Sequence, residues 1–255
     1  MTLLDALILG IIQGITEFLP ISSSGHLVLT EHLLHLEVAA LKGFDVVLHA
    51  GTLVAIFAYF WKDIWAAARN LKMIGYILLA TIPAGVLGLT LEDWLDEVFR
   101  DPSMIFGVMI LLALYFVIAE KFPPQKNKTQ FTWRNTFVMG LAQAVALIPG
   151  VSRSGSTISA GLLFGLKREE AAKFSFILGI PAIAGATLLT GIKVVQGEAP
   201  MPETSMVIMG FLVSAVVGYV SVSFLMKFLK KNSLHVFAIY LVVVGVLGLL
   251  STYSF

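Results

Sequence analysis

Two stretches decide the fold of this chain: PISSSGHLVLTEHLLHL at residues 20–36 and PGVSRSGSTISAGLLFGL at residues 149–166. Each opens with a short tip rich in Pro, Gly and Ser, at residues 20–25 and 149–155, inside otherwise apolar sequence. Irregular backbone with polar side chains is tolerated at membrane depth only where it is buried in protein or lines a wet cavity. Both tips are therefore expected to face a polar cavity.

The arms that follow the two tips are too short to cross a bilayer. Residues 27–36 and 157–166 are ten residues each, so as helices they reach only about 15 Å, half of a hydrocarbon core. The arm before each tip is longer. Residues 3–36 and 132–166 are therefore predicted to form two re-entrant helical hairpins.

The composition of the whole chain is typical of a membrane protein. The 255 residues are 58% hydrophobic and only 13% charged, against about a quarter charged in soluble proteins. The mean hydropathy is +0.90. Six apolar stretches are predicted to span the membrane: 43–61, 73–91, 104–119, 174–192, 204–226 and 236–255.

The charges between these stretches predict the topology, because Lys and Arg are retained on the cytoplasmic side. Basic and acidic connections alternate along the chain: 62–72, 121–134 and 227–231 are basic, whereas 92–101 and 198–203 are acidic. Both termini are then expected outside. The first residues lack the basic start of a cleavable signal peptide, so they are expected to belong to the mature protein.

Charge and cysteine content exclude several classes of function. The net charge is +1 and no long basic run is present, which argues against a nucleic-acid partner. The sequence has no Cys, which excludes disulfides and cysteine-based metal sites.

The two halves of the chain repeat each other at an offset of 130 residues. The offset superimposes identical residues around the hairpins: Gly10 on Gly140, Gln13 on Gln143, Ser22 on Ser152, Ser24 on Ser154 and Gly25 on Gly155. Repeats 1–125 and 131–255 each hold one hairpin and three spans, and because three is odd the second copy is inverted. The predicted fold is one all-α integral membrane domain over residues 1–255, with six transmembrane helices, two re-entrant hairpins and an inverted-topology repeat. In such folds the broken helix ends meet near the midplane.

Together the tips offer the side chains of a phosphate site. Arg153 is a planar multiple donor, and helices that begin at Ser- and Gly-rich tips point free N–H groups into the site. Glu17 is a candidate base or metal ligand, Gln13 lies on the same helix face, and His26 can move a proton near neutral pH. Further candidates for binding the anion are small and polar: Ser22, Ser23, Ser24, Gly25, Ser152, Ser154, Gly155, Ser156 and Thr157.

Simpler interpretations exist for several of these residues. Serine before a helix is most often only an N-cap. The same S-x-S-G pattern in both tips, with Arg, Glu and His in apolar surroundings, favours function, since ionisable residues inside a membrane are rarely structural. Asp45 and His49 are expected to be cap or interface residues, and Glu31, His32 and His35 to lie near the membrane surface.

The segments QGITEFLPISSSGH (residues 13–26) and PGVSRSGST (residues 149–157) resemble the two signature motifs of the bacterial undecaprenyl-diphosphate phosphatase family, also called the bacitracin-resistance protein family. The similarity extends over the whole chain in length, span count and motif position. In the family's first motif, Glu or Gln precedes a second Glu by four positions, and here these are Gln13 and Glu17. The Gln variant leaves open how many oxygens could bind a metal.

The resemblance implies an enzyme that removes the terminal phosphate of a C55 isoprenyl diphosphate on the outer face of the bacterial cytoplasmic membrane. Hydrolysis returns the lipid carrier to cell-wall synthesis and confers bacitracin resistance. It also implies a divalent cation, Mg²⁺ or Ca²⁺, held by Glu17 and Gln13, with catalytic roles for Glu17, Ser23, His26 and Arg153.

Three questions stay open at this point. The nucleophile could be His26, Ser23 or a water molecule. The architecture alone would also suit a transporter or a polyprenyl-phosphate flippase, because inverted repeats with broken helices are usual in carriers. Besides lipid and substrate, a homodimer partner is conceivable, but the scattered small residues do not define a dimer face.

Overall fold

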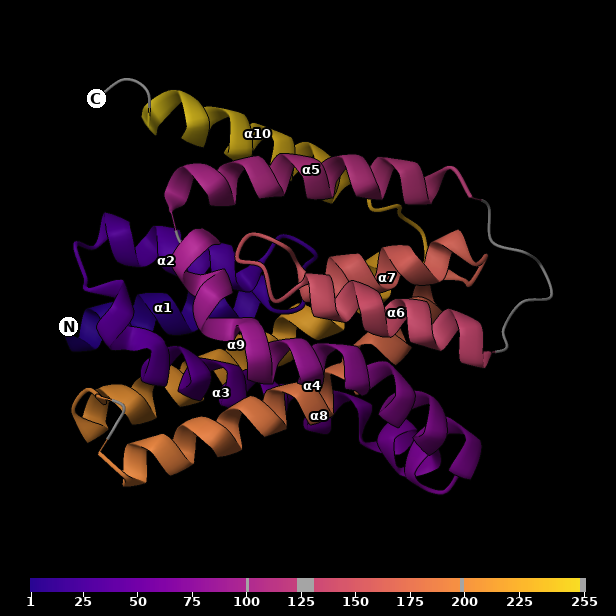
Figure 1. Cartoon of the computed structure of the whole chain (residues 1–255), viewed down its shortest axis with the longest axis horizontal. Coiled ribbons are helices and arrows are strands. Elements are labelled where there is room, and N and C mark those ends of the chain that lie inside the picture. The colour runs from indigo at the N-terminus through magenta and orange to yellow at the C-terminus, as the bar shows by residue number, and fades with distance from the viewer. Residues whose placement is uncertain (100, 123–130, 198–199, 253–255) are drawn as a thin grey trace.

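The computed structural model describes residues 1–99, 101–122, 131–197 and 200–252, which form helices and short connections without a strand among them (Figure 1). Six helices are long and apolar enough to cross a membrane: α3 (Lys42–Ala68), α4 (Leu71–Phe99), α5 (Pro102–Glu120), α8 (Arg168–Val195), α9 (Thr204–Leu229) and α10 (His235–Thr252). Large apolar side chains such as Leu111 and Val216 lie on their outer surfaces. These surfaces suit lipid, so the chain is a multi-pass membrane protein and the prediction of six spans is confirmed.

Some helices extend beyond the predicted spans. α3 continues to Ala68, and α4 runs through to Phe99, so the prediction of a loop over 92–101 is largely wrong. The acidic and apolar residues after 91 are compatible with a helix, and no Pro follows Pro83 until Pro102. Parts of the predicted spans and loops lie outside the described residues: Arg100, Lys126, Lys128, Glu198 and 253–255.

The two predicted hairpins correspond to two pairs of short helices: α1 (Leu3–Thr16) with α2 (Ser23–Leu33), and α6 (Trp133–Val145) with α7 (Arg153–Leu163). α2 and α7 have 11 residues each, about 16 Å, so they are as short as the sequence suggested. Both begin four residues before the predicted arms. The reason is local, because the Ser22 and Ser152 side chains accept hydrogen bonds from the N–H groups of Gly25 and Gly155 and so start the helices within the tips. A short 3-10 helix, η1 (Val38–Leu41), connects α2 to α3.

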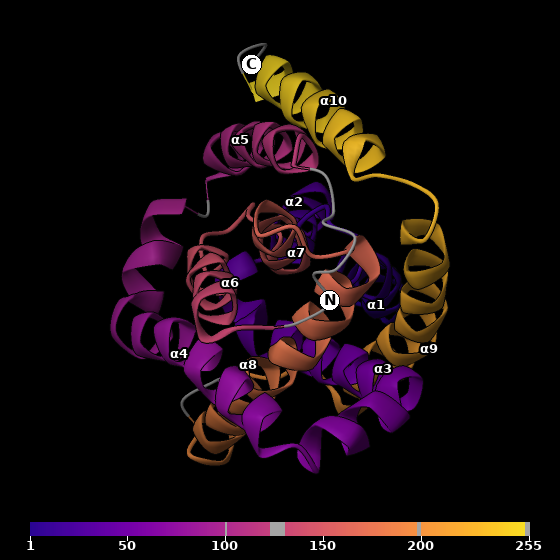
Figure 2. The ribbon, with the colours of Figure 1, turned by 90° about the vertical axis from the view of Figure 1, so that its right-hand side faces the viewer.

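Each first arm packs against a long helix from the other half of the chain. α1 lies along α9, and α6 lies along α4, while α3 packs against α8 and α5 against α10. Seen along the long axis of the molecule, α2 and α7 lie near the centre, with longer helices around them and α10 at the periphery (Figure 2). The hairpin tips are therefore enclosed by the bundle.

Small residues allow the close crossings of the first arms. A Cβ on Gly10 would lie 3.1 Å from the Gly210 carbonyl oxygen, and a Cβ on Gly140 would lie 2.6 Å from the Ala80 Cα. Gly10 and Gly140 are 130 positions apart, and so are Ala80 and Gly210. The same crossing thus occurs once in each half, between helices that approach as closely as small residues permit.

Substituting Gly140 tests this crossing. Gly140→Ala would press its methyl group against the backbone of Ala80, so we expect it to reduce the free energy of unfolding by about 2 kcal/mol through overpacking. Gly85→Ala in α4 is the matched control, because its Cβ meets nothing within 4 Å and alanine favours a helix. Thermal unfolding in detergent measures both, and equal midpoints would contradict the proposed close contact.

Candidate active site

The two hairpin tips meet in the middle of the bundle. Arg153 at the start of α7 forms an ion pair with Glu17 at the end of α1, with 2.5 Å between Nη2 and Oε1, across 136 residues of sequence. A Cβ on Gly155 would lie 3.1 Å from the Cβ of Pro20 in the other tip and would overlap the Phe116 ring of α5. The predicted convergence of the tips is therefore confirmed, and glycine is required where they touch.

Glu17 is the centre of the polar cluster, and only 6% of its surface is exposed. Oε1 accepts from Arg153, while Oε2 accepts from the Ser23 hydroxyl at 2.8 Å and from the Gln13 amide at 3.1 Å. His49 Nε2 of α3 lies 3.5 Å from the same Oε2. A buried carboxylate needs such compensation, because an unpaired charge in an apolar interior costs several kcal/mol.

Arg153 is held over α8 by its neighbours. Its Nη1 donates to the Ser175 carbonyl oxygen at 3.3 Å, and the guanidinium lies so close to Gly179 that a Cβ there would overlap it. The position of the guanidinium thus depends on the absence of a side chain at residue 179. Its remaining N–H groups are available to an anion that enters the site.

His26 has its two ring nitrogens engaged elsewhere. Nδ1 lies 2.7 Å from the Ser22 carbonyl oxygen and Nε2 lies 2.8 Å from the Tyr240 hydroxyl, and the two rings stack at 5.7 Å. The carbonyl can only accept, so the neutral ring carries its proton on Nδ1 and accepts from Tyr240. The structure therefore ties His26 to α10 and brings Ser23, rather than His26, against Glu17.

The other predicted binding residues have mixed surroundings. Ser22 and Ser152 act as N-caps, as the simpler interpretation held, and Ser152 Oγ also lies 3.2 Å from Ser154 Oγ. Thr157 is fully buried and its hydroxyl contacts Ser175 Oγ and the Arg153 carbonyl, so it fastens α7 to α8. Ser24 is half-buried beside Ser23 on the first turn of α2. The caps still leave the first N–H groups of α2 and α7 without intrahelical acceptors, as an anion site requires.

The predicted metal ligands fit a cation that is only partly held by protein. Gln13 Oε1 is buried without a hydrogen-bond partner, on the amide whose Nε2 donates to Glu17 Oε2. The described residues contain no cluster of three or more His, Cys, Asp and Glu side chains, so a full protein cage is absent there. Mg²⁺ is usually bound through one or two carboxylates together with water and substrate phosphate, and Gln13 and Glu17 meet that need.

Several residues at the site were missed by the sequence analysis. The interpretation of His49 as a cap or interface residue is wrong, because the packing of α3 brings it to Glu17. Ser175, Gly179 and Tyr240 were not singled out either. A signal existed for two of them, since Ser175 and Gly179 are the repeat counterparts of Asp45 and His49 at the 130-residue offset.

Comparison with known proteins gives a consistent result. The family model described as Bacitracin resistance protein BacA matches residues 6–247. The chain is 44% identical to the undecaprenyl-diphosphatase of Pelotomaculum thermopropionicum, over 96% of this chain and 95% of that protein. It is 43% identical to that of Trichlorobacter lovleyi over 96% of both chains, and 40% identical to that of Thermomicrobium roseum over 98% of both.

The Glu17–Arg153 pair can be tested by stability alone. Arg153→Met should lower the free energy of unfolding by about 3 kcal/mol, because it leaves a buried carboxylate without its guanidinium. The double variant Glu17→Gln/Arg153→Met should lose less, since no charge remains. Lys230 and Glu169 form a matched surface pair at 3.3 Å, and its removal should change stability by less than about 1 kcal/mol. Additive effects of the two substitutions at Glu17 and Arg153, measured in detergent, would show that the pair is not coupled.

Proposed function

This chain belongs to the Bacitracin resistance protein BacA family, and on that premise we propose how its buried polar cluster performs the reaction. The protein is an undecaprenyl-diphosphatase: it hydrolyses the terminal phosphate of undecaprenyl diphosphate to undecaprenyl phosphate and inorganic phosphate. The contact of Ser23, Glu17 and Arg153 between the tips is the observation that carries the mechanism.

We assign the nucleophile to Ser23. Its hydroxyl already donates to Glu17 Oε2 at 2.8 Å, and Glu17 is held in place by Arg153 and Gln13, which is the arrangement of a nucleophile with an oriented base. Ser23 Oγ forms a bond to the terminal phosphorus while the bond from that phosphorus to the bridging oxygen breaks. Glu17 takes the hydroxyl proton, and undecaprenyl phosphate leaves.

A water molecule then completes the hydrolysis. Its oxygen bonds to the phosphorus of the phosphoserine and its proton passes to His26, while the bond from phosphorus to Ser23 Oγ breaks. Glu17 returns its proton to Ser23 Oγ, and inorganic phosphate leaves. The leaving group of the first step is a phosphate monoester, which is stable as an anion, so that step depends on cationic stabilisation more than on a general acid. We therefore assign His26 to proton exchange in the second step, after release from Tyr240.

Arg153 and the helix starts stabilise the charge on the transferred phosphoryl group. The guanidinium can share its donors between Glu17 and the phosphate, and the first N–H groups of α2 and α7, which begin at Ser23 and Arg153, lack intrahelical acceptors and can add further donors. Divalent Mg²⁺ or Ca²⁺, bound by Glu17 and Gln13 Oε1, would neutralise further charge on the phosphate oxygens.

The membrane arrangement in this proposal follows the loop charges. The N- and C-termini lie outside, the two halves are inverted copies, and both hairpins re-enter the bilayer without crossing it, with the site open to the outer side of the cytoplasmic membrane. The repeated crossing of Gly10 with Gly210 and of Gly140 with Ala80 supports the inverted repeat.

Phosphate release from undecaprenyl diphosphate in detergent, with Mg²⁺ or Ca²⁺ supplied, tests the function. Glu17→Ala and Arg153→Ala should each reduce turnover by at least about 100-fold, because each removes a preorganised charge at the transferred group. The surface variants Glu169→Gln and Lys230→Gln should retain activity. No release by the wild type would favour the carrier alternative instead.

Trapping of a phosphoenzyme tests the nucleophile. Acid quenching during turnover should leave an acid-stable phosphate on Ser23, which peptide mass mapping locates, and Ser23→Ala should abolish it. His26→Ala should instead slow loss of the phosphate from the enzyme. An acid-labile phosphohistidine at residue 26, or no covalent species in the His26→Ala variant, would contradict the assignment of Ser23.

A further inference from the structure

A cavity lies between α3, α4 and α8, and none of its lining residues belongs to the polar cluster around Glu17. Its volume is about 240 Å³, and residues from all three helices line it: Val46, Gly88, Leu89, Thr90, Ala186, Leu189, Thr190 and Lys193. A space of this size is much too small for a whole C55 isoprenyl chain, so only a head group and the beginning of a tail could occupy it.

This cavity continues the faces of the helices that carry the active site. On α3, Val46 lies about one turn before His49, which contacts Glu17. On α8, Ala186 is two turns beyond Gly179, which supports Arg153, so the two positions share a helix face about 10 Å apart. On α4, a Cβ on Gly88 would lie 3.9 Å from Leu147, in the connection from α6 to α7. The cavity therefore lies beside the second tip, toward the end of the bundle where α8 ends.

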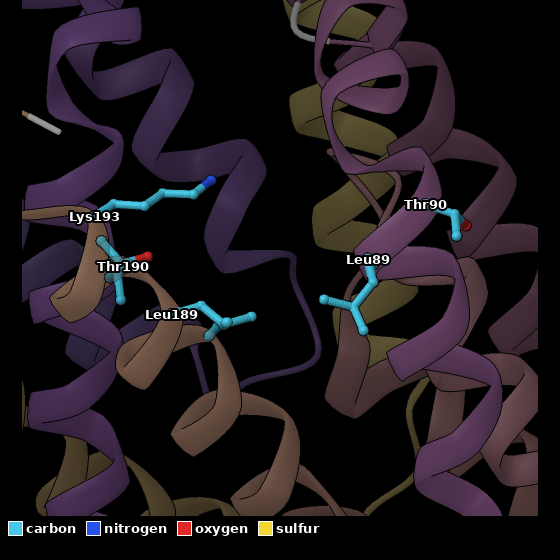
Figure 3. Close-up of a pocket in the computed structure, with 8 residues that line it drawn as sticks. Leu89, Thr90, Leu189, Thr190 and Lys193 are labelled. Carbon is cyan, nitrogen blue, oxygen red and sulfur yellow. The ribbon is translucent and has the colours of Figure 1, made fainter. Parts of the chain in front are cut away.

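The lining of the cavity is amphipathic. Leu89 of α4 and Leu189 of α8 point toward each other across it, and Lys193 extends over the same space (Figure 3). Leu89 is 74% exposed and Leu189 is 47% exposed, although both lie on membrane-spanning helices. Two apolar walls with one ammonium group at the rim match a ligand with an anionic head and an apolar tail.

We propose that the gap between α4 and α8 is a side portal through which the isoprenyl diphosphate passes from the outer leaflet into the active site. The inference rests on the proposed function and adds a route and a first binding step to it. Lys193 receives the diphosphate head at the rim, Leu89 and Leu189 contact the first isoprene units, and the remaining tail stays in the bilayer between α4 and α8. Because a 240 Å³ space cannot hold the whole lipid, most of the tail must lie outside it, in the bilayer.

Reversible closure of the portal is the direct test. Because the chain has no native Cys, a thiol reagent will react only with the introduced residues. Leu89→Cys/Leu189→Cys is treated with a cleavable bis-maleimide in detergent, and phosphate release is measured with undecaprenyl diphosphate and with geranyl diphosphate, whose short chain can reach the site from water. Cross-linking should reduce turnover of the long substrate at least about tenfold and leave that of the short one nearly unchanged. Cleavage of the linker should restore activity, and the two single-Cys variants with the same reagent serve as controls.

Two outcomes would overturn the portal. Undecaprenyl diphosphate could turn over normally in protein that mass spectrometry shows to be fully cross-linked. Alternatively, both substrates could lose activity equally, which would mean that the gap is not a passage used selectively by the long-chain lipid. Absence of phosphate release by wild type and by the untreated variant is a different failure, because it would refute the proposed function on which the portal rests.

Lys193 has its own measurement. Lys193→Gln should raise KM for undecaprenyl diphosphate about fivefold, the effect of one partly solvated ion pair, with kcat unchanged. Lys193→Arg should restore KM. Lys167→Gln, just before the opposite end of α8, is the control and should leave KM unaltered. An unchanged KM in Lys193→Gln would refute capture of the head group at the rim.

Discussion

Glu17 lies at the end of α1 with almost no exposed surface, and Arg153 from the opposite hairpin neutralises its charge. In an apolar bundle neither charge can remain alone, so the two tips must come to the same depth and face each other. Other features of the interior serve this contact. Gly179 makes room for the guanidinium, Gly155 allows the tips to touch, and Ser175 holds both Arg153 and Thr157. The ion pair thus joins the two halves of the chain at the proposed active site.

The short helices place their N-terminal ends inside the bundle. α2 and α7 end their hairpins inside the bundle, and a serine N-cap starts each of them in the tip. The cap satisfies one backbone N–H and leaves the others of the first turn directed at the site. A helix that spanned the bilayer would have its N-terminus at the water surface. Only half-length helices bring positive helix ends to the interior, where an anion gains most from them.

The long helices give this polar centre its apolar surroundings and leave it a route to lipid. α1 and α6 are held by close crossings with α9 and α4, where small residues replace the hydrophobic driving force that is absent between helices in lipid. α4 and α8 instead stand apart near one end of the bundle, around the cavity with Leu89, Leu189 and Lys193. Tight packing between one set of helices and a gap between another suit an enzyme whose substrate has a diphosphate head and a long isoprenyl tail.

The sequence by itself determined the membrane class, the six spans, the two half-length hairpins and the meeting of their tips. These follow from the lengths of apolar runs and from the 130-residue offset, which are local or periodic properties of the chain. It also identified Glu17, Arg153 and Ser23 as candidates, because ionisable and hydroxyl groups are conspicuous in apolar surroundings. It placed the starts of α2 and α7 four residues late, since Ser and Gly suit a tip as well as a first helical turn.

Only the tertiary structure decided which side chains touch. It brought His49 to Glu17, tied His26 to Tyr240 across 214 residues, and turned Ser22, Ser152 and Thr157 toward structural hydrogen bonds. It also opened the cavity between α3, α4 and α8. The physical reason is that the rotation of a helix about its axis is set by packing against its neighbours, and hydropathy alone does not fix which polar residue of an apolar helix faces the site.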